Sequence, residues 1–60
     1  MTDKQRRFAD EYIIDCNATR AYKAAYPRIK SDNAARVNAS RLLTNANVKA
    51  YIEAKLDELS

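Results

Sequence analysis

Apolar residues recur every three or four positions along most of the chain, a spacing that predicts amphipathic helices and leaves no alternation typical of a strand. The first helix begins with a capping-box pattern, because Thr2 is followed three residues later by Gln5. We expect this helix to run to about Asp15. Its apolar side would comprise Phe8, Ala9, Tyr12, Ile13 and Cys16.

A second, shorter helix is predicted to follow almost at once. Asn17 can cap its N-terminus, and Pro27 cannot continue it because proline lacks the backbone N–H and clashes with the preceding turn. Residues 26–30 then form a predicted connector. The apolar positions of this helix at helical spacing are Ala18, Ala21, Tyr22 and Ala25.

Two more helices complete the chain. Either Ser31 or Asp32 can cap a third helix that ends near Thr44, and either Asn45 or Asn47 can cap a fourth. The inward stripe of the third helix is predicted to be Ala35, Ala39, Leu42 and Leu43. That of the fourth is predicted to be Val48, Tyr51, Ile52, Leu56 and Leu59.

Small side chains occupy the facing sides of the second and third helices, at Ala21, Ala25, Ala35 and Ala39. Short side chains let two helices cross closely, as in a helix-turn-helix pair. With 60 residues there is room for one small domain. We therefore expect an all-α fold in which residues 1–60 form a single four-helix domain containing a helix-turn-helix.

The residue inventory argues against catalysis. Without histidine or glycine and with one cysteine, the chain has neither the ligands of a zinc site nor a phosphate-binding glycine loop. The adjacent acids Asp10-Glu11 and Asp57-Glu58 point about 100° apart on a helix and suit a solvated surface better than a catalytic pair. We expect no enzyme activity, no metal and no cofactor. Apolar runs are too short for a membrane span, and the lone Cys16 fits a reducing compartment.

Positive charge is concentrated in the middle of the chain. The whole chain carries only +3, from 11 basic and 8 acidic residues. Between residues 20 and 49, however, there are seven basic residues and a single acid, Asp32, which gives that stretch a net charge of +6. Such a stretch is the electrostatic feature expected of a surface that follows phosphates. The basic residues are Arg20, Lys23, Arg28, Lys30, Arg36, Arg41 and Lys49.

The side of the third helix opposite its alanines presents Asn33, Arg36, Val37, Ser40 and Arg41. Arginine can reach guanine edges or phosphates, asparagine can pair with adenine, and small residues permit a close approach to a major groove. An ordinary solvated helix face usually mixes both signs of charge, which this one does not. We therefore predict double-stranded DNA as a partner. The predicted contacts also include Arg20, Lys23, Arg28 and Lys30.

Two segments carry a family resemblance, KQRRFADEYIIDCNATRAYKAAYP and ARVNASRLLTNANVKAYI. Together they strongly resemble the N-terminal domain of the small terminase subunit of tailed bacteriophages and prophages. The most specific features are the spacing of Phe8 and Tyr12, the NAT that caps the second helix, and the SRLLTNANV junction between the last two helices. Many members have glycine where Ala25 stands and a shorter connector, so the turn over residues 25–30 is left open.

The resemblance implies a role in viral genome packaging. The protein would recognise the packaging-initiation site on concatemeric viral DNA in the bacterial host cytoplasm and hand DNA to the large terminase subunit, which supplies the ATPase and nuclease. It also implies that these residues are a fragment. The full-length protein would be a ring-like homo-oligomer formed through a later domain, whereas this fragment would be a monomer with no membrane partner.

Two other functions remain open from the residues. A helix-turn-helix transcriptional regulator would share the basic helix but usually carries its own dimerisation element. Alternatively, the basic face could serve a protein-interaction module that binds an acidic partner and has weak affinity for DNA of any sequence.

Overall fold

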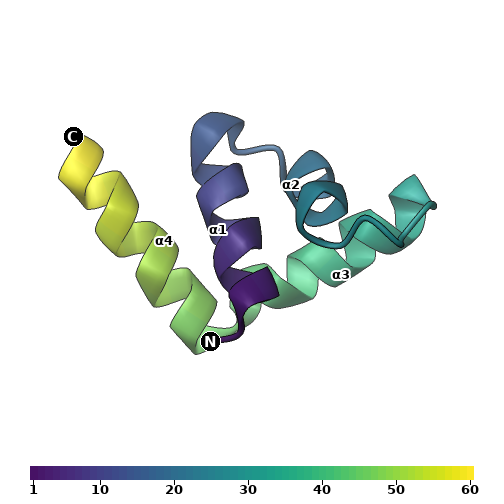
Figure 1. Cartoon of the computed structure of the whole chain (residues 1–60). Coiled ribbons are helices and arrows are strands. Elements are labelled where there is room, and N and C mark those ends of the chain that lie inside the picture. Colours follow the sequence, from purple (N-terminus) through teal and green to yellow (C-terminus); the bar gives the residue numbers. More distant parts are fainter.

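Four α-helices follow one another along the chain in the computed structural model, which describes residues 1–60. They are α1 (Asp3–Asp15), α2 (Ala18–Ala25), α3 (Asp32–Thr44) and α4 (Ala46–Leu59). Helix α1 packs against α2 and α4, and α3 packs against the same two helices (Figure 1). The predicted all-α, four-helix fold is confirmed.

Side-chain caps fix where the helices begin. The Thr2 hydroxyl accepts from the Gln5 N–H at 3.1 Å, and the Gln5 side chain accepts from the Thr2 N–H at 3.0 Å, which confirms the capping box. The Asn17 side chain caps α2 through the Arg20 N–H. Of the alternatives left open, Ser31 caps α3 and Asn45 caps α4, where Asn45 accepts from two backbone N–H groups. Each cap satisfies donors that the first helical turn leaves free.

The turn between α2 and α3 explains how alanine can stand at position 25. The N–H of Ile29 donates to the Tyr26 carbonyl at 3.0 Å, which closes a turn with Pro27 at its second position, where the fixed φ of proline is favourable. Tyr26, the C-cap of α2, has φ −125°. No residue here has the positive φ that would favour glycine, so Ala25 remains helical and buried.

The core is small and consists mostly of alanine. Phe8 and Val48 are the largest side chains that are fully buried, and Ile52 is 6% exposed. Partly buried apolar residues, mainly tyrosines and leucines, pack around this core. The five buried alanines are Ala9, Ala21, Ala25, Ala35 and Ala39.

The alanines on α2 and α3 are buried, as predicted, and these two helices pack against each other. Ala21, Ala35 and Ala39 have no exposed surface, and Ala25 is 6% exposed. Because these side chains are short, the two helices can approach each other without a thick layer of side chains between them. Consequently the opposite side of α3 is left facing solvent.

Three of the predicted inward residues face solvent instead. Cys16 is the C-cap of α1 and adopts the left-handed region, at φ 56°, so it leaves the helical stripe and is exposed to solvent. On α4, Leu56 is 39% and Leu59 is 72% exposed. Their exposure follows from the course of α4, whose C-terminal turns diverge from α1 (Figure 1). None of the helices is both long and apolar enough to cross a membrane.

Candidate nucleic-acid interface

The outer face of α3 consists of Asn33, Arg36, Val37, Ser40 and Arg41. All five residues are exposed, and they lie opposite the buried alanines of the same helix. Val37 is the one large apolar side chain among them, and it is 44% exposed. The predicted exposure of this face is therefore confirmed, whereas contact with DNA stays a prediction.

Both arginines of the outer face keep their positive charge uncompensated. Neither Arg36 nor Arg41 forms an ion pair with any carboxylate. Arg36 donates to the Asn33 side-chain oxygen at 2.8 Å, which holds its guanidinium along the helix surface. The Ser40 hydroxyl donates to the Arg36 carbonyl at 3.0 Å, so it lies close to the backbone and adds little bulk. The outer face thus presents cationic hydrogen-bond donors beside side chains that project little from the helix.

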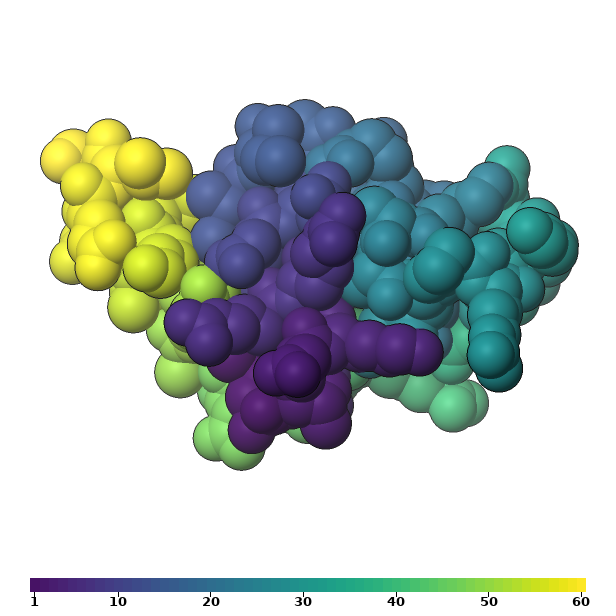
Figure 2. Space-filling model, in the orientation of Figure 1, coloured from purple at the N-terminus to yellow at the C-terminus, as the bar shows by residue number.

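The connector adds two further cations beside the start of α3. Arg28 and Lys30 are exposed and form no ion pairs. The connector and the N-terminal turn of α3 lie at one end of the elongated molecule, and the C-terminal turns of α4 lie at the other (Figure 2). The molecule measures 33 × 20 × 17 Å, so the two ends are well separated.

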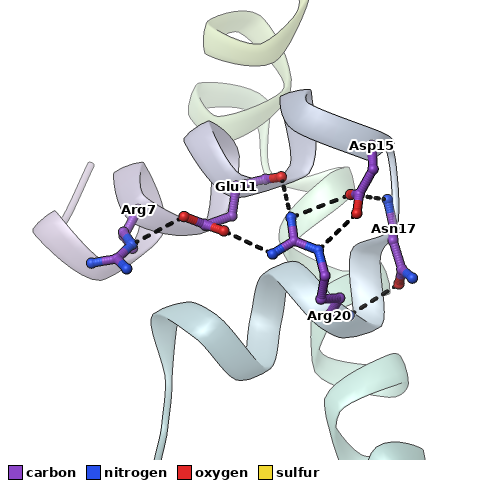
Figure 3. Close-up of polar contacts among 5 residues, drawn as sticks. All are labelled: Arg7, Glu11, Asp15, Asn17 and Arg20. Carbon is purple, nitrogen blue, oxygen red and sulfur yellow. Dashed lines mark hydrogen bonds and ion pairs between the residues drawn. The ribbon is translucent and has the colours of Figure 1, made fainter.

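Arg20, in the first turn of α2, reaches across to two acids of α1 (Figure 3). Its guanidinium donates to the Asp15 and Glu11 carboxylates, each at 2.8 Å, and to the Glu11 carbonyl at 2.7 Å. Arg7 extends the group through its own ion pair with Glu11 at 3.5 Å. Charge-assisted bonds of this kind are the stronger ones among protein hydrogen bonds. Arg20 therefore joins the two helices, and its charge is already balanced.

The titration of these groups reflects the same contacts. Hydrogen bonds from Arg20 lower the pKa of Glu11 and the pKa of Asp15, against a smaller opposing effect of desolvation. Hydrogen bonds to Asp15 and Glu11 in turn raise the pKa of Arg20. All three groups accordingly keep their charges over the neutral pH range.

Lys23 is also paired. Its ammonium nitrogen lies 2.6 Å from a carboxylate oxygen of Asp32, so the pair joins α2 to the first turn of α3. The two residues border a shallow, open hollow of about 330 Å³ that no hydrophobic residue lines. Its other lining residues are Asn17, Thr19 and Arg20.

The structure thus divides the nine predicted DNA contacts into two groups. The outer face of α3 and the connector cations are exposed and free of ion pairs, whereas Arg20 and Lys23 are paired with acids. Sequence reasoning missed both pairings and the hollow, because the partners of Arg20 and Lys23 are five to nine residues away and across a turn. The bond from Arg36 to Asn33 could have been predicted, since residues three apart are neighbours on a helix.

These features define a small helical domain with one cationic, acid-poor helix face. The family model described as terminase small subunit matches residues 1–60, and the chain belongs to that family. The chain is 47% identical over 60 residues to the terminase small subunit of Staphylococcus phage 80alpha. This alignment covers 98% of the chain but 39% of the length of that relative. No solved structure matches the chain.

Proposed function

We propose that this domain binds double-stranded DNA through a helix-turn-helix formed by α2, the connector and α3. The observation that carries the proposal is the outer face of α3, which is exposed and has two arginines without acidic partners. In this arrangement α2 crosses the DNA backbone and α3 lies in the major groove, as in other helix-turn-helix proteins.

The side chains divide the work between bases and phosphates. Arg36 and Arg41 are long enough to reach guanine edges or phosphates, while Val37 and Ser40 permit a close approach and contact the groove surface. Arg28 and Lys30 neutralise phosphates beside the groove, since phosphate contacts position a protein on DNA. Arg20 supports this surface indirectly, because its bonds to α1 fix the orientation of α2.

Membership of the terminase small subunit family supports a role in viral genome packaging. We propose that the domain recognises the packaging-initiation site and that the full-length protein presents several copies to the DNA as a homo-oligomer and acts with the large terminase subunit. The domain itself carries out no catalysis. One copy alone should be a monomer that binds DNA with a Kd on the order of 10⁻⁴ to 10⁻⁶ M. Linked copies would bind more tightly because linkage raises the effective concentration.

The test replaces Arg36 and Arg41 separately with alanine and measures binding to duplex DNA at two salt concentrations. Each change should weaken binding while altering the free energy of unfolding by no more than about 0.5 kcal/mol, as is usual for surface sites. A lost phosphate contact should reduce the salt slope by about one unit, whereas a lost base contact should cost about 1 to 3 kcal/mol mainly on a preferred site. Lys55→Ala removes one positive charge on α4, away from the outer face of α3, and serves as a control; unlike the two arginines, Lys55 has an acidic partner, Glu58, at 3.7 Å.

The proposal is wrong if both arginine variants bind DNA like the parent at both salt concentrations. Binding that is weak and indifferent to both arginines, together with tight binding of an acidic protein, would favour the protein-interaction alternative. Separating packaging from transcriptional regulation requires genomic context, because both use a helix-turn-helix. A neighbouring gene for a large terminase subunit would support packaging.

A further inference from the structure

Asp32 is the single acid within the basic stretch of residues 20–49, and it lies at the edge of the proposed DNA-binding surface. It occupies the first turn of α3, immediately before Asn33 of the outer face. Its side chain is 78% exposed, yet its carboxylate is only 2.6 Å from the ammonium nitrogen of Lys23. Asp32 thus holds a cation that would otherwise be available to a phosphate.

The pair is not needed to bury either charge, since the Lys23 side chain is itself 42% exposed. An exposed ion pair of this kind contributes little to stability. The pair has a larger effect on DNA binding than on stability, because DNA affinity depends on the number of phosphates that the protein neutralises. The ammonium group has three N–H donors, so a phosphate can still bond to Lys23, but the neighbouring Asp32 carboxylate repels it.

We propose that Asp32 acts as an internal competitor of DNA phosphate for Lys23 and so lowers the sequence-independent affinity of the domain. This inference rests on the proposed DNA-binding function. The Asp32 carboxylate, at the start of α3, bonds to the Lys23 ammonium group beside the polar hollow. The pair does not involve Arg36 or Arg41, so DNA binding depends more on their contacts with bases and less on contacts with phosphates.

The test is Asp32→Asn, which keeps the shape of the side chain and removes its charge. Affinity for a random-sequence 20-base-pair duplex should rise about two- to fivefold at low salt, the size expected for one exposed charge interaction. The plot of log K against log salt should become steeper by about 0.9, because Lys23 now neutralises one more phosphate. Asp57→Asn on α4 makes the same change in net charge far from this surface and should alter both quantities much less.

A second variant asks whether Lys23 is the cation released. The double variant Asp32→Asn with Lys23→Gln should return to the affinity and salt slope of the parent, because both charges of the pair are gone. Thermal melting of each variant checks that it is folded under the binding conditions. A gain that persists in the double variant, or a gain no larger than that of Asp57→Asn, would overturn this inference while leaving DNA binding intact. Failure of the parent to bind any duplex would instead refute the proposed function.

Discussion

Replacing Phe8 with alanine should remove the largest single contribution to the core. Phe8 has no exposed surface, and its ring centre lies 6.1 Å from that of Tyr12 and 6.2 Å from that of Tyr22. It therefore joins α1 to α2 through aromatic packing. The alanines that make up much of the remaining core cannot move into the space that the ring would leave without shifting whole helices.

The expected loss is large compared with the total stability of so short a chain. Truncating a buried phenylalanine to alanine costs about 3 to 5 kcal/mol. A domain of 60 residues is stabilised by only about 3 to 9 kcal/mol in all, from the usual range per residue. The Tm should fall by about 12 to 24 °C for a loss of 3 kcal/mol, because small domains shift by about 4 to 8 °C per kcal/mol. Phe8→Ala is therefore expected to lose at least about a third of the total stability, and all of it at the lower end of the range.

Thermal unfolding followed by circular dichroism measures this directly. Ile14→Ala is the matched control, because Ile14 is a large apolar residue of the same helix that is 71% exposed. Its substitution should change stability by no more than about 0.5 kcal/mol. If Phe8→Ala melted within a few degrees of Ile14→Ala, then Phe8 would not be a core residue and the orientation of α1 would be wrong.

Two further predictions concern α1 and its end. Arg20→Gln should lower the Tm at pH 7, and the difference from the parent should shrink in acid. The folded-state pKa values of Glu11 and Asp15 lie below their ordinary values of 4.5 and 3.8. The stability that Arg20 confers is therefore fully present above the ordinary pKa values and is lost as pH falls through the lowered folded-state values. A Tm difference that stays constant from pH 7 to pH 2 would contradict this. Cys16→Gly should stabilise the fold by up to about 1 kcal/mol, because glycine adopts the φ of 56° found at Cys16 without a steric penalty. A lower Tm for the glycine variant in thermal unfolding would show that the left-handed turn at Cys16 is not strained.

Local patterns were sufficient to predict the helices and their order. The capping box at Thr2 and Gln5, the cap at Asn17 and the stop at Pro27 all involve residues within four positions of one another, where sequence spacing determines contact. The outer face of α3 was predictable for the same reason. Once Ala35 and Ala39 are buried, the helical period alone places Arg36 on the opposite side.

Contacts between helices were not predictable in this way. The pairing of Arg20 with Glu11 depends on how α2 crosses α1, and that of Lys23 with Asp32 depends on the turn at Pro27. The exposure of Leu59 follows from the divergence of α4, because a helical stripe shows which side is apolar but not how far a partner helix extends along it. Sequence reasoning therefore identified the cationic residues without showing which cations are already paired.

DNA binding by α3 can be tested by an NMR titration of the ¹⁵N-labelled chain with duplex DNA, which reports on the backbone amides without any substitution. If α3 lies in the major groove, shift changes should concentrate on its outer face, from Asn33 to Arg41, and on the connector residues Arg28 and Lys30, and they should weaken as salt is raised. The C-terminal turns of α4, including Leu56, should change little. Shift changes centred on α4 and the end of α1, or none at DNA concentrations above about 10⁻³ M, well beyond the range of non-specific Kd values, would contradict DNA binding by α3.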